Sequence, residues 1–170
     1  MASLMEDFMS ILEEENGGYQ RLTELSQKKT QIIIDGDIPA LEAITDQEQE
    51  ITSRLKNLEN KRNEVVNDMS IVLSKPAEDL TVTNMIAFLN KQPQEQSKLI
   101  DLRDRLRETL EKMAEVNSQN ETLLQHAMEM AEFDLTLFRS MRQAPTTANY
   151  DNRANNTGDL LGNSGFDAKQ

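Results

Sequence analysis

A long apolar stripe between residues 41 and 72 constrains the fold more than any other feature of the sequence. Its members recur in alternating steps of three and four, the spacing of a coiled-coil seam along one face of an α-helix. All are apolar except Glu48 and Arg62. The stripe predicts a helix over residues 38–73, about 50 Å long at 1.5 Å per residue. Its members are Leu41, Ile44, Glu48, Ile51, Leu55, Leu58, Arg62, Val65, Met69 and Val72.

A weaker stripe precedes it and predicts a helix over residues 3–34. Continuing its phase places Glu15, Gly18 and Lys29 on the same line as the apolar side chains. Gly17 and Gly18 interrupt this helix at a cost of about 1 kcal/mol each relative to Ala. They mark a hinge, a close contact between helices, or a weak spot that the fold tolerates. The apolar members are Leu4, Phe8, Ile11, Leu22, Leu25 and Ile32.

The sequence DGD at residues 35–37 combines a helix stop with a helix start. Gly36 can adopt the left-handed conformation that follows a helix end. Asp37 can cap the next helix, with Pro39 in its first turn. Because the link is so short, the first two helices are predicted to be antiparallel neighbours.

Beyond residue 73 the long pattern stops. A connector at 74–93 is predicted to hold a short helix near residues 83–90, capped by Thr83, whose apolar side chains cover one end of the bundle. A third helix is predicted over residues 94–142, about 70 Å long. Residues 143–170 are rich in Asn and Gly, without periodicity, and are predicted to be a flexible tail. The expected fold class is all-α: an antiparallel three-helix coiled-coil bundle over 1–142, with a long C-terminal helix and a disordered tail.

The third helix is longer than its predicted partners, which can cover only about its first two thirds. The remainder is expected to project, and Phe133, Leu137 and Met141 share one face there with Phe138 beside them. An uncovered apolar face on a helix is what docking of another helix requires. Core filling and a homodimer interface are the alternatives.

Two amides, Asn117 and Asn120, lie where the buried stripe of the third helix should run. An Asn at a seam position lowers stability but selects register and helix number, because the amide needs a particular partner. Alternatively, these amides face a groove and bond to the backbone of a bound protein.

Charge and composition exclude several classes of function. A formal net charge of -12 with interspersed Lys and Arg disfavours nucleic-acid binding. No apolar run approaches the roughly 18 residues needed to span a bilayer, and Glu6 and Asp7 stand where a signal peptide would be positive. The absence of cysteine suits a reducing compartment. A cytoplasmic protein with protein partners, without stable membrane insertion, is therefore expected.

An enzyme is not expected either. His126 is the one histidine, and with Glu129 it forms at most half of a helical metal pair. Nucleophilic catalysis would need a positioned base beside a serine or cysteine, and there is no cysteine. The glycines at 17 and 18 lack the lysine and spacing of a phosphate-binding loop. We expect no catalytic residue, no metal and no cofactor.

Two stretches resemble a known family. "EVNSQNETLLQHAMEMAEF" at 115–133 is similar to the signature of the FlgN-type flagellar export chaperones, whose long last helix carries an asparagine-rich turn, a leucine pair and an amphipathic stretch. The second helix resembles the family's "D.P.L..I...E..I...L..LE..R" run, and the resemblance covers roughly residues 4–142. The positions that match this run are Asp37, Pro39, Leu41, Ile44, Glu48, Ile51, Leu55, Leu58, Glu59 and Arg62.

The resemblance implies a cytosolic chaperone of flagellar type III secretion. Such a protein binds the helical terminal regions of hook-associated proteins of the hook-filament junction, prevents their premature association and delivers them to the export apparatus, without catalysis, as a monomer or weak homo-oligomer. Tyr150 is a loose match to a family tyrosine and a candidate contact with the export gate. The alternative is a self-associating coiled-coil adaptor or tether. The client-binding residues predicted from the resemblance and from the two amides are Asn117, Asn120, Leu123, Leu124, Met128, Met130, Phe133, Leu137, Phe138 and Met141.

Overall fold

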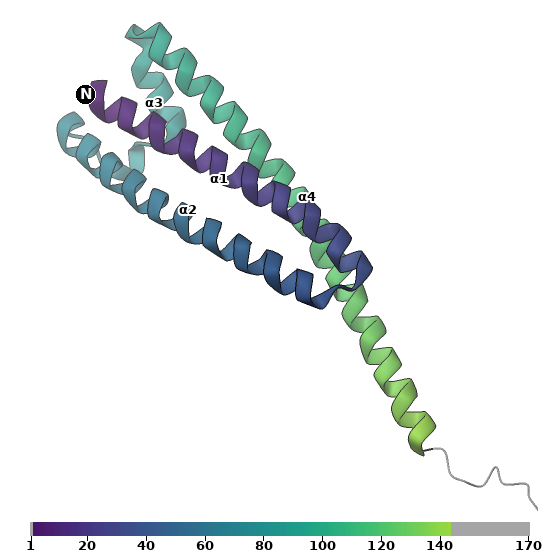
Figure 1. Cartoon of the computed structure of the whole chain (residues 1–170). Coiled ribbons are helices and arrows are strands. Elements are labelled where there is room, and N and C mark those ends of the chain that lie inside the picture. Colours follow the sequence, from purple (N-terminus) through teal and green to yellow (C-terminus); the bar gives the residue numbers. More distant parts are fainter. Residues whose placement is uncertain (1, 144–170) are drawn as a thin grey trace, which may run out of the picture. The chain divides into compact units, whose positions relative to one another are not determined.

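The computed structural model describes residues 2–143, and these are almost entirely helical (Figure 1). Three long helices are joined by one tight turn and one connector, which confirms the predicted all-α fold with a long C-terminal helix. The predicted tail beyond α4, including Tyr150, lies outside the described residues. The elements are α1 (Ala2–Asp35), α2 (Ile38–Leu73), η1 (Ala77–Asp79), α3 (Val82–Phe88), η2 (Leu89–Lys91) and α4 (Pro93–Gln143).

The chain divides into two units, Met1–Met128 and Glu129–Gln170. The first unit contains α1, α2, the connector and α4 as far as Met128. The described part of the second unit is the remainder of α4, which ends at Gln143.

The turn between α1 and α2 has the predicted chemistry. Gly36 is left-handed, with a φ of 67°. The amide of Asp37 donates to the carbonyl of Ile32, and the amide of Gly36 donates to that of Ile33, so two carbonyls in the last turn of α1 are satisfied. The carboxylate of Asp37 then accepts from the amide of Ala40 at 3.0 Å and caps α2. The prediction for this turn is confirmed.

The polar positions in the seams of α1 and α2 pair with one another. The Arg62 guanidinium lies 2.9 Å from the buried Glu15 carboxylate, and Lys29 lies 2.7 Å from Glu48. Residue numbers rise along α1 as they fall along α2, so these two helices are antiparallel. Each charge that interrupts one apolar stripe therefore faces its counterion on the other helix.

Contacts between α1 and α4 run in the opposite sense. Arg105 donates two hydrogen bonds of 2.9 Å to the Glu13 carboxylate, and these hold the pKa of Glu13 below its usual range. Further along both helices, Ser26 donates to Asn117 at 2.8 Å. Numbers rise together, so α4 is parallel to α1 and antiparallel to α2, as predicted.

A hydrophobic core lies where the connector meets the three long helices. It joins α1, α2 and α4 to apolar side chains of the connector, which confirms that the connector covers one end of the bundle. Its buried members are Met5, Phe8, Leu12, Met69, Leu80, Met85, Leu89, Leu99 and Leu102.

The predicted cap of the short helix was wrong by two residues. Thr81, not Thr83, precedes α3: its backbone is extended and its hydroxyl accepts from the amide of Asn84 at 3.2 Å. Thr83 lies inside the first turn of Val82–Phe88. Both threonines can cap a helix, and only the backbone conformation at Thr81 decides between them.

The two glycines have different surroundings, although α1 is continuous through both. A Cβ added at Gly18 would lie 2.6 Å from Cδ2 of Leu55, so Gly18 marks a close approach of α1 and α2. A Cβ at Gly17 would meet no atom within 4 Å. The contact with Leu55 thus explains why a glycine occupies position 18, whereas packing among the described residues does not explain the glycine at position 17.

We expect Gly17→Ala to raise the free energy of unfolding by up to about 1 kcal/mol, because alanine is the better helix former and the site is open. Gly18→Ala should gain less or lose stability, because the Leu55 side chain must move. Urea unfolding followed by circular dichroism measures both. An equal gain at the two positions would argue against the close contact.

Candidate protein-binding surface

The end of α4 carries large apolar side chains that remain exposed. Met130, Phe133, Leu137 and Met141 follow steps of three, four and four, and thus lie along one face of the helix. Phe138 lies beside this line. Their exposed fractions are between 48% and 69%. We call this set the C-terminal apolar face: Met130, Phe133, Leu137, Phe138 and Met141.

The other side of the same segment is mostly polar. Glu132, Thr136 and Arg139 recur at steps of four and three away from the apolar line. The segment 129–143 is therefore amphipathic, but its apolar side is exposed: Phe133 is 67% exposed, whereas Phe8 in the core is 2% exposed. An apolar face of this kind is typical of a surface that binds another helix.

Sequence reasoning did not single out Leu135, which is 55% exposed. It lies three residues from Glu132 and four from Arg139, on the side of the helix away from the apolar face, although three residues also separate it from Phe138. Of the other predicted residues, Leu123 and Leu124 are half-buried and Met128 is 64% exposed, all within the first unit.

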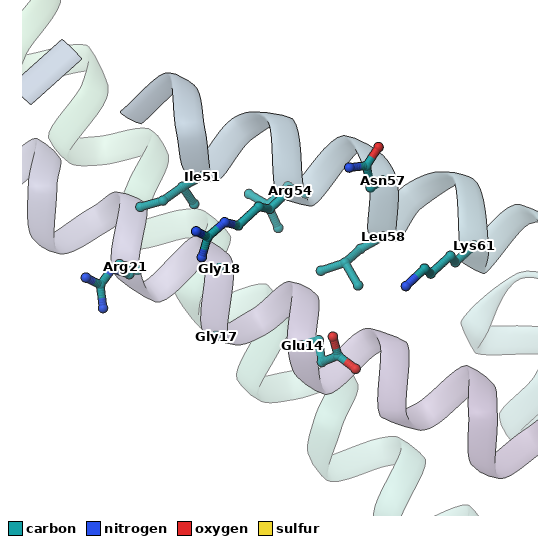
Figure 2. Close-up of a pocket in the computed structure, with 10 residues that line it drawn as sticks. Glu14, Gly17, Gly18, Arg21, Ile51, Arg54, Asn57, Leu58 and Lys61 are labelled. Carbon is teal, nitrogen blue, oxygen red and sulfur yellow. The ribbon is translucent and has the colours of Figure 1, made fainter. Parts of the chain in front are cut away.

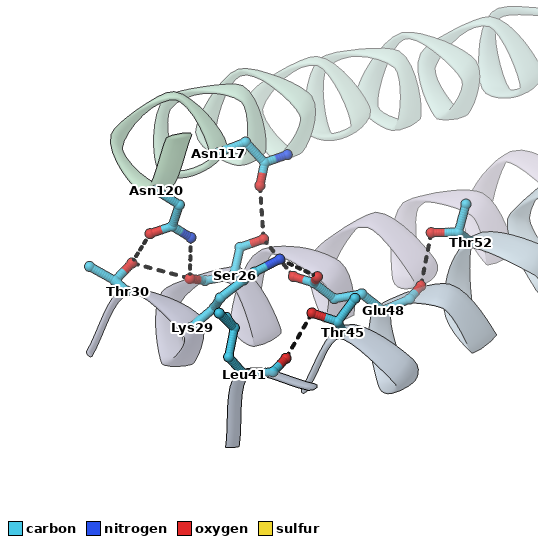
Figure 3. Close-up of polar contacts among 9 residues, drawn as sticks. All are labelled: Ser26, Lys29, Thr30, Leu41, Thr45, Glu48, Thr52, Asn117 and Asn120. Carbon is cyan, nitrogen blue, oxygen red and sulfur yellow. Dashed lines mark hydrogen bonds and ion pairs between the residues drawn. The ribbon is translucent and has the colours of Figure 1, made fainter. Parts of the chain in front are cut away.

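Asn120 bonds inside the bundle (Figure 3). The Thr30 hydroxyl donates to its side-chain oxygen at 2.6 Å, and its side-chain nitrogen donates to the carbonyl of Ser26 at 2.8 Å. The residue is 4% exposed. Because both polar atoms of the amide are occupied and buried, we correct its assignment to the client-binding surface.

Asn117 belongs to the same polar layer (Figure 3). Its side-chain oxygen accepts from the Ser26 hydroxyl at 2.8 Å, and the same hydroxyl lies 3.4 Å from Glu48 of α2. The layer thus joins all three long helices. Since the amide oxygens are bound by α1, the geometry favours selection of register over contact with a bound protein. The Asn117 side chain is nevertheless exposed, so its assignment to the client-binding surface stays a prediction.

Other kinds of site find no counterpart in the described part of the chain. Within residues 2–143, no group of three or more His, Cys, Asp and Glu side chains is placed to hold a metal ion. His126 is exposed on α4. Over the same range, no helix is both long enough and apolar enough to cross a membrane.

Comparison with known proteins agrees with this arrangement of helices. A family model described as FlgN protein matches residues 1–158, which include all of the described residues. The chain belongs to the FlgN family. As a FlgN protein it has the general role of that family, a chaperone in flagellar export. No curated protein and no solved structure matches the chain.

The family match places the candidate surface in context. The C-terminal apolar face of this FlgN protein lies within the matched residues, and so does Tyr150. The polar layer and the paired charges align the bundle, while the apolar face is left exposed. The face can bind a partner protein, because it offers apolar surface area and carries few chemically reactive side chains.

Proposed function

We propose that this FlgN protein binds the helical terminal regions of hook-associated proteins through its C-terminal apolar face. The observation that carries the proposal is the exposure of that face, whose large side chains are between 48% and 69% exposed. Together with family membership, this exposure supports binding of a client whose apolar side chains cover the face.

Burial of such side chains supplies the driving force. Each contributes about 1.5–3 kcal/mol when fully buried, whereas association costs about 4–15 kcal/mol. The net affinity therefore depends on a few well-buried anchors, and aromatic side chains are the usual ones. Phe133 and Phe138 are the aromatic members of the face.

This binding also accounts for chaperoning without catalysis. The face replaces apolar contacts that client helices would otherwise make with one another, so it prevents premature association and needs no cofactor. We propose that the protein acts in the cytoplasm as a binding protein rather than an enzyme, and delivers its clients to the type III export apparatus. Tyr150 is our candidate contact with the export gate.

The test is calorimetry with the terminal region of a hook-associated protein. The combined variant Phe133→Ser, Leu137→Ser and Phe138→Ser should bind at least tenfold more weakly, about 1.4 kcal/mol. The matched control places serine on the polar side, as Glu132→Ser, Thr136→Ser and Arg139→Ser, and should retain affinity. Unchanged binding in the first variant, or an equal loss in both, would refute the proposed placement.

The same exposed face also suits a second copy of the chain, as in a self-associating adaptor or tether. Light scattering separates the two functions. We expect a monomer or weak homo-oligomer that becomes a mixed complex when the client region is added. A dimer at all concentrations that persists with client would favour the adaptor.

A further inference from the structure

A second surface lies between α1 and α2, where a groove of about 470 Å³ opens on the first unit (Figure 2). Ile51, Leu55 and Leu58 of α2 contribute its apolar lining, opposite Gly17 and Gly18 of α1. The groove shares no residue with the C-terminal apolar face.

Gly17 is the first reason to regard this groove as a binding site. It lies in the interior of α1, where glycine costs about 1 kcal/mol relative to alanine. Its neighbour Gly18 lies against the Leu55 side chain, but no atom of another helix among the described residues lies within 4 Å of a Cβ at Gly17. A glycine that leaves open space beside an apolar lining allows close approach of another chain.

Charge indicates what kind of chain fits. Arg21, Arg54 and Lys61 border the groove, against one carboxylate, Glu14 (Figure 2). Among the described residues, Arg54 pairs with Glu50 in an exposed ion pair, whereas no salt bridge involves Arg21 or Lys61. A positive border on a protein of net charge -12 complements an acidic partner.

The dimensions match a helix. The α2 positions that line the groove recur at steps of three and four from Ile51 to Lys61, a length of about 15 Å at 1.5 Å per residue. A surface of this length suits the packing of an amphipathic helix that places anchors at matching steps. A second groove, between α1 and α4, is lined by polar and charged side chains such as Thr23, Glu24 and Glu108, and offers no such lining.

We propose that the groove between α1 and α2 binds an acidic amphipathic helix of a partner protein, whose apolar side chains lie over Gly17 and Ile51 and whose carboxylates meet Arg21 and Lys61. This site is separate from the proposed client surface and does not depend on it. It gives the chaperone a second point of attachment to a protein partner.

The probe is a labelled synthetic helical peptide, about five turns long, with leucines at steps of three and four and flanking glutamates. Fluorescence anisotropy with the full chain should show saturable binding. Gly17→Leu should weaken it at least tenfold, and circular dichroism should show that this variant stays folded because the site is open. The same peptide with lysines in place of glutamates should not bind.

A charge-matched pair completes the test. The double variant Arg21→Glu and Lys61→Glu should lose at least tenfold in affinity, whereas Lys28→Glu and Arg107→Glu, with the same change of net charge, should not. The serine variant of the C-terminal apolar face should bind the peptide normally. Absence of saturable peptide binding would overturn the proposal, and so would equal losses of peptide affinity in the two charge variants or a loss in the serine variant. If light scattering shows that Gly17→Leu abolishes self-association, the groove binds a second copy of the chain, which would also overturn it.

Discussion

Arg62→Ala is expected to lower the free energy of unfolding by about 3 kcal/mol at neutral pH. The substitution leaves the Glu15 carboxylate without its counterion, and that side chain is 2% exposed. Breaking a buried pair typically costs about 3–5 kcal/mol. We take the lower end because Arg62 is itself 32% exposed, and water can therefore solvate part of the vacated site. Urea unfolding measures the loss.

The pH dependence identifies the cause. Burial raises the pKa of the Glu15 carboxyl, and the Arg62 guanidinium offsets part of that rise. Without Arg62 the pKa rises further above its unfolded value. A carboxyl whose pKa is higher in the folded than in the unfolded state contributes its full stabilisation below the pKa of the unfolded state. That contribution is lost as pH rises through the pKa of the folded state. The loss of unfolding free energy caused by Arg62→Ala should therefore become smaller as pH is lowered toward about 4.3.

The control for this effect is Glu15→Gln in the Arg62→Ala background. This substitution removes the titrating carboxyl. The difference in free energy of unfolding between the double variant and Glu15→Gln alone should therefore not vary with pH in that range. A deficit of Arg62→Ala that is the same at every pH would show that lost packing of the arginine side chain, and not the buried carboxylate, is responsible.

Two phenylalanine-to-alanine substitutions should differ by several kcal/mol. Phe8 is 2% exposed in the core that joins the connector to the long helices, and Phe8→Ala should cost about 3–5 kcal/mol. Phe138 is 66% exposed, and Phe138→Ala should change stability by no more than about 0.5 kcal/mol. Chemical denaturation of both variants provides the comparison. A large loss from Phe138→Ala would mean that the chain already covers this side chain.

Periodicity predicted the helices of this protein but not the pairing between them. It placed Glu15 and Lys29 on the seam of α1, and Glu48 and Arg62 on that of α2. Steps of three and four determine which face of a helix a residue occupies, not which residue of another helix lies opposite. That register depends on the turn at Gly36, whose exact geometry is needed before the two ion pairs can be assigned.

The candidate surface was predictable to a similar degree. Comparison of predicted helix lengths was enough to predict the exposure of Phe133 and Leu137. The role of Asn120 could not be decided in advance, since its partners are a hydroxyl of Thr30 and a backbone carbonyl, groups that occur throughout the chain. The groove at Gly17 depends on how closely α1 approaches α2, which composition does not reveal.

The most direct test of client binding is hydrogen exchange of the full chain with and without the terminal region of a hook-associated protein. In the free chain, amides at 129–143 should exchange readily, because their apolar side chains are exposed and tertiary packing there is sparse. Client should slow exchange of these amides at least tenfold. Protection that is already complete in the free chain, or that appears on binding only outside 129–143, would contradict the assignment of this face to the client.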